Sequence, residues 1–384
     1  MAASLHPPHA TTSASSSSPS SPRALAATRL DTSSTHFKSL VELSSIALGA
    51  TIESFSDDFF AEVHNMIKLG PPVDMPGQFG PNGSLMDGWE RAIVKLGAAG
   101  AIHGFDIDTR HFAGNECPAT DVWGATVEPD QTIKNESDQW QQILPLTPLG
   151  PAQQHFLLLP RPLGPFTHLK VTQHPDGGIG RFRAYGHIAP SSVDSSSNSK
   201  RIDLASILQG GRVTSTSDEH YSVGSYLLLP GRGKDMEDGW HTRRSRGRLD
   251  TDQGDWLVVE LGQGGGFLEW CDIDTKDFKG NFPDQVALYG CEATAASSGT
   301  ERPKIPPIED AMRGWTCLLD RQNVGAHAHH VRELKEKGKT WAHVCLRIYP
   351  DGGLKRLRLF GRPSDGSVDY ATLTPMEKPV FDDE

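Results

Sequence analysis

The chain has 384 residues, of which 36% are hydrophobic and 22% are charged, and its net charge at pH 7 is −11. This length predicts two or three domains, and the negative charge argues against nucleic acids and anionic membranes as partners. The sequence holds no apolar run of the ~20 residues that a membrane helix needs. Its five cysteines, without any CxxC spacing, favour free thiols in a reducing compartment over disulfides or a zinc site.

The first segment, residues 1–36, is rich in Ser, Ala, Pro and Thr. Such a composition cannot bury enough apolar surface to fold, so we expect a disordered tail. Arg23 and Arg29 precede its first acid, Asp31, and this leaves an organellar targeting peptide open as the alternative. Otherwise the sequence predicts an intracellular, cytoplasmic protein.

Three sequence blocks occur twice in the same order, which predicts an internal duplication. Asp-Gly-Trp stands at 87–89 and 238–240, Asp-Ile-Asp-Thr at 106–109 and 272–275, and Pro-Asp-Gly-Gly at 175–178 and 350–353. We therefore expect repeat 1 over residues 37–190 and repeat 2 over 200–370. A Ser-rich linker at 191–199 separates them, and a polar tail covers 371–384.

The two copies differ after the Asp-Gly-Trp block. The numbering offset between the copies rises from 151 at Asp87 to 166 at Asp106. Repeat 2 therefore carries about 15 residues after Trp240 that repeat 1 lacks after Trp89. They include the run Thr-Arg-Arg at 242–244, so an arginine-rich loop is predicted in repeat 2 alone.

Strand signals dominate both copies. Residues 344–349 and 355–360 alternate in part between apolar and polar side chains, and they flank an Asp-Gly turn typical of a tight hairpin. Many short strands joined by Gly and Pro turns within ~160 residues are typical of a β-sandwich. The expected fold is all-β, with two tandem β-sandwiches; a short helical patch is expected at 329–337.

The strongest chemical signal surrounds Trp240. Arg243 and Arg244 follow it closely, and two guanidinium groups beside an aromatic ring suit a planar anion such as a carboxylate. Asp238 and Trp240 belong to the block that both copies share, so we include them in the predicted binding site. The alternative is a Trp packed under a turn, with solvated arginines.

Two further groups carry possible acid–base chemistry. Asp272 and Asp274 are two residues apart on a predicted strand, so they face one side, where they could serve acid–base chemistry or hold a hard cation. The alternative is an Asp that caps a turn. His330 and its counterpart His155 occupy equivalent positions, and either a general acid–base role or a structural hydrogen bond fits them.

The turn that follows supplies Lys279 and Asn281, as ligand contacts or as turn residues only. The run His-Ala-His-His at 327–330 resembles a metal site, but repeat 1 has Gln153 and Gln154 around its His155. We therefore predict neither a metal nor a cofactor. The chain contains no Gly-x-Ser-x-Gly, Walker or His-Glu-x-x-His motif.

Together these motifs resemble the allantoicase (allantoate amidinohydrolase) family. The resemblance covers residues 37–365, and it rests on the runs at 238–244, 254–262 and 272–281 and on both Pro-Asp-Gly-Gly blocks. It implies two jelly-roll domains of the galactose-binding-like type. The chain departs from the family pattern in repeat 1, which lacks the Thr-Arg-Arg and Asp-Trp elements. It also carries His241 where the family has an acidic residue.

The resemblance implies hydrolysis of allantoate to ureidoglycolate and urea, in purine (allantoin) catabolism. In this scheme Arg243 and Arg244 hold the substrate carboxylate and Trp240 walls the pocket. His330 and the pair Asp272 and Asp274 are the candidate acid and base. The expected partner is a small-molecule substrate, and a homo-oligomer stays open. The rival hypotheses are a tandem jelly-roll protein that binds a small ligand without catalysis, and a partly degenerate pseudo-enzyme.

Overall fold

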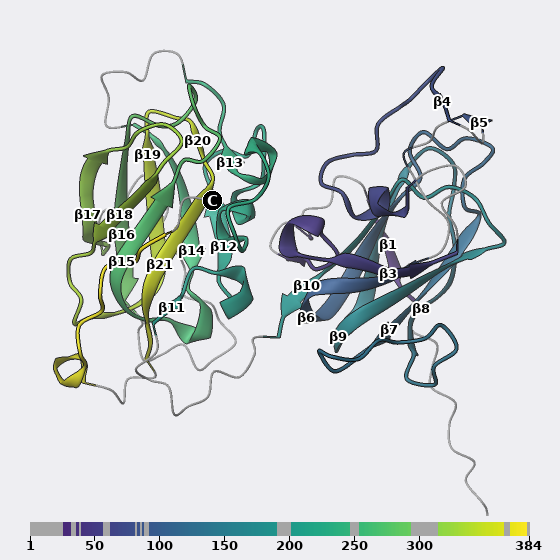
Figure 1. The fold of residues 1–384 in the computed structure, drawn as a ribbon, viewed down its shortest axis with the longest axis horizontal. Coiled ribbons are helices and arrows are strands. Elements are labelled where there is room, and N and C mark those ends of the chain that lie inside the picture. The colour runs from purple at the N-terminus through teal and green to yellow at the C-terminus, as the bar shows by residue number, and fades with distance from the viewer. Residues whose placement is uncertain are drawn as a thin grey trace, which may run out of the picture.

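The fold consists of two β-sandwiches that lie side by side, one for each repeat (Figure 1). The computed structural model describes residues 26–31, 36–37, 40–56, 62–80, 83–84, 87, 92–189, 201–245, 253–292, 314–364 and 369–381. The described secondary structure is strands and short 3-10 helices, which confirms the all-β duplicated fold. The described part has no helix of the length and apolarity that a membrane crossing requires.

Repeat 1 forms a sheet in the order β2-β10-β6-β9-β7-β8, with β1 beside β9 and β3 beside β6. Its longest strands, β6 and β9, each run through both layers of the sandwich, and register shifts mark where they bend. The strands are β1 Thr28–Leu30, β2 Val41–Glu42, β3 Thr51–Phe55, β4 Phe79–Gly80, β5 Gly83–Ser84, β6 Ala92–Asp108, β7 Ala119–Ala125, β8 Gln141–Pro148, β9 Gln154–His174 and β10 Arg181–Ile188.

Repeat 2 has the same plan, in the order β11-β21-β15-β19-β14-β12, with β18 beside β15 and β16 between β17 and β19. Two pairs, β14 with β15 and β18 with β19, take the places of the long β6 and β9. The strands are β11 Ile202–Asp203, β12 Arg212–Thr216, β13 Trp240–His241, β14 Asp255–Glu260, β15 Gly266–Asp274, β16 Gln285–Glu292, β17 Thr316–Asn323, β18 His329–Glu333, β19 Thr340–Tyr349, β20 Gly353–Leu354 and β21 Arg356–Pro363.

The Pro-Asp-Gly-Gly blocks form matching connections in the two copies. They do not form the predicted hairpins, because the flanking strands (β9 and β10 in repeat 1, β19 and β21 in repeat 2) do not pair with each other. A Cβ atom added at Gly353 would lie 1.9 Å from the Phe278 ring, and one at Gly178 would lie 1.9 Å from the Phe112 ring. Glycine is therefore required in both copies because an aromatic ring packs directly on the backbone. This close contact gives the repeated glycines a packing role.

Two further expectations need correction, one on the helical patch and one on the N-terminal tail. The helical patch expected at 329–337 is strand β18 followed by a turn, because the backbone at Ile273 and Trp270 pairs with it in the sheet. The N-terminal tail is ordered in part, since β1 pairs with β9. The C-terminal segment 369–381 packs on repeat 2, where the Met376 amide donates to Glu269 Oε2 at 2.8 Å. The linker 191–199 lies outside the described residues.

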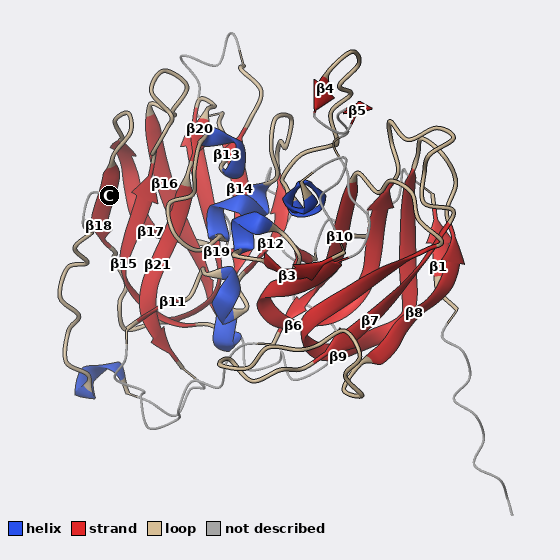
Figure 2. Cartoon of the chain, turned by 45° about the vertical axis from the view of Figure 1, so that its right-hand side comes forward, coloured by secondary structure: helices blue, strands red, loops and turns tan. Residues whose placement is uncertain are grey.

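Most of the short 3-10 helices lie between the two sheets, whereas η8 (Tyr370–Thr372) lies at the outer edge of repeat 2 (Figure 2). Helix η2 (Val63–Ile67) belongs to repeat 1, and its equivalent η5 (Gly224–Leu228) belongs to repeat 2 at an offset of 161. The larger of the two buried apolar clusters contains residues of both repeats. The same segment of each copy therefore contributes to the junction, as in a two-fold interface.

Candidate functional site

The Asp-Gly-Trp block is anchored by a buried ion pair in each repeat. Arg356 Nη2 lies 3.0 Å from Asp238 Oδ2, and its Nε donates to the Gly231 carbonyl at 3.0 Å. In repeat 1, Arg181 Nη2 lies 2.8 Å from Asp87 Oδ2, and its Nε donates to the Gly70 carbonyl at 3.3 Å. Because the arrangement is the same in both copies, it fixes the loop in space whether or not the arginine-rich segment follows.

Lys355 adds a second cation to this anchor in repeat 2 only. Its side chain is fully buried, and Nζ donates to Asp238 Oδ1 and to the Asp235 carbonyl. Burial lowers the pKa of Lys355 to about 8. Repeat 1 has Gly180 at this position, so the lysine is a feature that comparison of the two copies could have revealed.

The predicted carboxylate pair lies on β15, and both of its members are buried and engaged. Arg232 binds Asp274 with two hydrogen bonds of 2.9 Å, and they lower the pKa of Asp274 against the opposing effect of burial. Asp272 Oδ2 lies 2.6 Å from His329 Nδ1 and Oδ1 accepts from the His330 amide at 3.0 Å. These carboxylates are therefore held by protein partners.

His330 has a partner for each ring nitrogen. Its Nε2 accepts from the Gly325 amide at 2.7 Å, so Nδ1 carries the proton and donates to the Ile273 carbonyl at 2.9 Å. In repeat 1, His155 Nε2 likewise lies 3.2 Å from the Gly150 amide. The shared geometry corresponds to the structural alternative, a histidine that joins a loop to a strand.

Arg243 and Arg244 follow β13 and are both exposed. Arg244 Nη1 lies 3.0 Å from Asp351 Oδ1, and its Nη2 donates to the Gly280 carbonyl at 2.9 Å. Arg243 Nη2 lies 3.1 Å from His220 Nδ1. Arg244 therefore lies beside the turn at 277–284, and Arg243 lies beside the loop at 218–222. Both side chains are exposed to solvent, where an anion can reach them.

Trp240 lies elsewhere than expected. Its side chain is 0% exposed, and Nε1 donates to the Asp218 carbonyl at 2.9 Å. The indole therefore fills the core under the loop and walls no pocket at the surface. This burial corresponds to the alternative reading, a Trp packed beneath a turn.

His241, the next residue, is the group that the sequence reasoning did not assign to the site. Its ring stacks on Tyr221 at a centroid distance of 4.6 Å, and Nε2 lies 3.5 Å from Asn281 Nδ2. Burial, followed by the nearby Arg244 charge, lowers the pKa of His241. The imidazole is therefore neutral at pH 7 and lies beside both a cation and an amide. Lys279, on the same turn as Asn281, is exposed.

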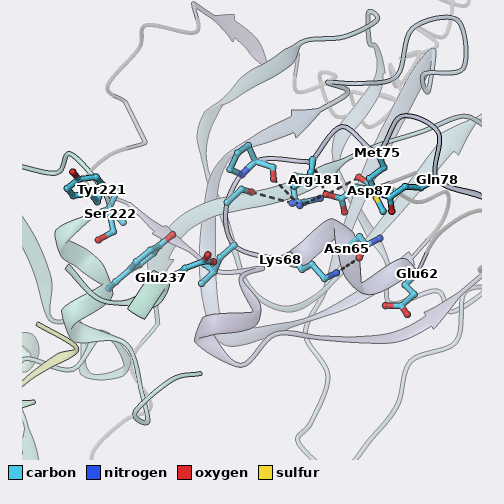
Figure 3. A pocket seen from close by; sticks show the side chains of 16 residues that line it. Glu62, Asn65, Lys68, Met75, Gln78, Asp87, Arg181, Tyr221, Ser222 and Glu237 are labelled. Carbon is cyan, nitrogen blue, oxygen red and sulfur yellow. Dashed lines mark hydrogen bonds and ion pairs between the residues drawn. The ribbon is translucent and has the colours of Figure 1, made fainter. Parts of the chain in front are cut away.

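A cavity of about 1010 Å³ lies between the two repeats. Figure 3 shows Lys68 and Arg181 on the repeat 1 side, with Tyr221 and Glu237 coming from repeat 2. Tyr221 belongs to both places, because it lines the cavity and also stacks on His241. The cavity and the arginine cluster are thus neighbours that share one wall.

Comparison with known proteins identifies the family. The sequence model of the allantoicase repeat matches residues 41–189 and 202–364. The chain belongs to the allantoicase family. It is 38% identical to a probable allantoicase of Schizosaccharomyces pombe over 338 residues, which cover 85% of this chain and 93% of that protein. It is also 37% identical to the allantoicase of Neurospora crassa over 358 residues, 88% of this chain and 97% of the other.

The family fold is also known from crystal structures. The allantoicase of Saccharomyces cerevisiae superposes with a TM-score of 0.70 at 33% identity, over 84% of this chain and 93% of that one. This chain therefore spans nearly the whole length of its relatives, and the family assignment covers both repeats. The family model matches both repeats, and each repeat contains the Asp–Arg ion pair described above.

All five cysteines lie in the described part of the chain and are free thiols. Burial raises the pKa of the Cys271 thiol to about 12 and that of Cys345 to about 12. Among the described residues, no group of three or more His, Cys, Asp or Glu side chains is arranged to hold a metal ion.

Proposed function

We propose that this protein hydrolyses allantoate to ureidoglycolate and urea, a step of purine catabolism, at the exposed end of repeat 2. Family membership over both repeats supports the reaction. The observation that carries the location is the placement of His241, kept neutral by burial, between Arg244 and Asn281. The five free cysteines support a reducing, cytoplasmic setting.

Substrate binding falls to the two arginines. Allantoate carries one carboxylate and two ureido groups on a single carbon atom. The guanidinium groups of Arg243 and Arg244 can each bind that carboxylate through a pair of N–H donors. The bonds from Arg244 to Asp351 and Gly280 hold its side chain in place beforehand, so less rotamer freedom is lost when substrate binds.

His241 is our candidate for proton transfer. A water molecule attacks the carbon that bears the ureido groups, so a C–O bond forms and one C–N bond breaks. The neutral imidazole takes the proton from water and returns it to the departing nitrogen, which leaves as urea. The ureidoglycolate keeps the new hydroxyl group, the carboxylate and the second ureido group. The Asn281 amide, 3.5 Å from His241 Nε2, can orient that second group.

The buried residues of the predicted site act in this scheme by positioning. Asp238 holds the loop through Arg356 and Lys355. Asp274 and Asp272 fix Arg232 and His329, and His330 joins its loop to β15. Trp240 supports the strand that presents His241. In this scheme these buried side chains hold Arg243, Arg244 and His241 in position, and they make no contact with the substrate themselves.

The test is a turnover assay on the purified full chain with allantoate. Equal molar amounts of urea and ureidoglycolate are expected, and allantoin serves as a negative substrate. An Arg161→Ala variant, changed at an exposed residue of repeat 1, is the matched control and should behave as the wild type. Binding of allantoate without release of urea would establish a ligand-binding protein instead and would overturn the proposal.

A further inference from the structure

The cavity between the repeats is built from equivalent segments of the two copies. Glu62, Asn65 and Lys68 are among the residues that line one side, and Tyr221, Val223 and Tyr226 are among those that line the other. Its volume of about 1010 Å³ is at the upper end of the range for small-molecule sites. A plain packing interface between duplicated domains would be expected to close such a space with apolar side chains.

The two walls of this cavity have diverged in chemistry. At an offset of 161, Glu62 of repeat 1 corresponds to Val223, Asn65 to Tyr226, and Lys68 to Leu229. At these three positions repeat 1 has a carboxylate, an amide and an ammonium group, whereas repeat 2 has aliphatic and phenolic side chains.

The charges of the cavity indicate what it can bind. Arg181 is saturated, because it donates to the Pro71 and Gly180 carbonyls as well as to Asp87. Lys68 lines the cavity and donates a hydrogen bond to Asn65 Oδ1 at 2.5 Å, and an ammonium group can donate three hydrogen bonds in all. The carboxylates of Glu62 and Glu237 also line the cavity and accept hydrogen bonds only.

We propose that this cavity is a second ligand site, for a small carboxylic acid that carries ureido or amide N–H groups. Lys68 binds the carboxylate of the ligand, and Glu62 and Glu237 accept its N–H donors. Tyr221 and Tyr226 supply aromatic surface for the carbon skeleton. The choice of a ureido group rests on the proposed function, since substrate and product both carry one. The arginine cluster beyond Tyr221 is a separate site.

This site also accounts for the form of repeat 1. That copy lacks the arginine-rich loop and has Gly180 in place of Lys355, so it offers no second copy of the proposed catalytic groups. Yet it keeps the Asp87–Arg181 anchor, and this anchor fixes the loop at Gly70 and Pro71 that forms the cavity wall. Repeat 1 therefore contributes Lys68 and Glu62 to the proposed binding site.

The test uses hydantoate (N-carbamoylglycine), which has one carboxylate and one ureido group but no second ureido group to lose. Its binding is measured by calorimetry on the full chain with Arg244→Ala, so that the arginine cluster contributes little. Adding Lys68→Met should weaken binding about tenfold or more, because one charge-assisted bond is lost. Adding Lys134→Met, at an exposed lysine of repeat 1, should leave binding unchanged.

A second variant keeps every charge in place. Val223→Trp fills the cavity from the repeat 2 side and should abolish hydantoate binding while thermal melting confirms the fold. Equal affinity in the Lys68 and Lys134 variants, or no hydantoate binding before either change, would overturn the second site. Allantoate turnover by the wild type is recorded separately, so a failure of the proposed reaction is distinguished from a failure of this site.

Discussion

Asp238 and Arg356 form an ion pair inside repeat 2, with Nη2 and Oδ2 3.0 Å apart, although 117 other residues separate them in the sequence. Arg356 is 1% exposed and Asp238 is 5% exposed. The pair joins the first residue of β21 to the last residue of the 3-10 helix η6 (Met236–Asp238), which precedes β13. Because Arg243 and Arg244 leave that strand, the ion pair sets the position of the groups that we assign to substrate.

Asp238→Asn should act on stability before it acts on substrate binding. Removing one member of a buried ion pair leaves the other charge uncompensated, and this typically costs about 3–5 kcal/mol. The free energy of unfolding, measured by urea denaturation, should fall by about this amount. Asp320→Asn, which alters an exposed pair with Lys335, is the control and should have no measurable effect. A stable but inactive Asp238→Asn protein would show that Asp238 contacts substrate.

Arg244→Ala should raise KM for allantoate. One charge-assisted bond to the carboxylate is worth about 1.5–3 kcal/mol, which corresponds to about 10–100-fold. Arg244→Lys keeps the charge but loses the two-pronged geometry, so an intermediate KM is expected. Steady-state kinetics with Arg161→Ala as the control measure the effect. A KM equal to that of wild type would remove Arg244 from the substrate site.

His241→Gln should lower kcat with little change in KM, because the amide fills the same space but cannot take a proton. General acid–base catalysis typically contributes about 100-fold or more. His241→Glu restores a base at this position and should recover part of the activity. Full activity in His241→Gln would exclude a proton-transfer role for this residue.

The pH profile offers an independent check on His241. Its pKa is lowered from the usual value by burial and by Arg244, so the neutral form persists at pH 7. The value of kcat/KM for the wild type should therefore stay level through neutral pH and fall only at more acidic pH, as the imidazole is protonated. In His241→Glu the acidic fall should shift, since a carboxylate titrates there. An identical profile in both proteins would contradict the assignment.

Glu42 should make the stability of repeat 1 depend on pH. Burial raises its pKa to about 7, so the folded state holds a proton that the unfolded state has released above pH ~4.5. Its contribution to stability is therefore present below that pH and is lost as pH rises through 7. The Glu42→Gln variant has no carboxyl group to titrate at this position. The difference between its unfolding free energy and that of the wild type should therefore rise by about 1–3 kcal/mol, in favour of the variant, from pH 5 to pH 8.

The control for that measurement is Glu128→Gln, at an exposed acid of repeat 1. Because its charge is already solvated, the difference from wild type should stay small and constant over the same pH range. Denaturant unfolding at each pH gives both differences. A Glu42→Gln curve parallel to that of wild type would show that the buried carboxylate is matched by Arg183, whose Nε lies 3.6 Å away.

Much of the fold could be predicted because it depends on sequence patterns within short segments. The ordered blocks predicted the duplication correctly. The hairpin expected around residues 350–353 was wrong, because β15 lies between β19 and β21 in the sheet and the two strands do not pair with each other. The segment at 329–337 was predicted wrongly, since its charged residues favour a helix but pairing with β15 decides its structure. The same holds for the ends of the chain, where β1 and the segment at Met376 gain their order from distant partners.

The site could be predicted only in part, for a related reason. Residue types and spacing placed Arg243, Arg244 and Asn281 near one another, and the structure brings them to one end of repeat 2. The spacing of residues in the sequence does not indicate which polar side chains are hydrogen-bonded to other buried groups of the protein. His330 and Trp240 are hydrogen-bonded to segments that lie far from them in the sequence. His241 likewise stacks on Tyr221, which lies 20 residues before it in the sequence.

The most direct measurement compares urea release from allantoate by the wild type and by the double variant Arg243→Ala with Arg244→Ala, at equal protein concentration and confirmed folding. We predict equimolar urea and ureidoglycolate from the wild type and a loss of at least about 100-fold in kcat/KM in the variant. Undiminished turnover in the variant would contradict a catalytic site at the end of repeat 2. Absence of urea from the wild type would contradict the reaction itself.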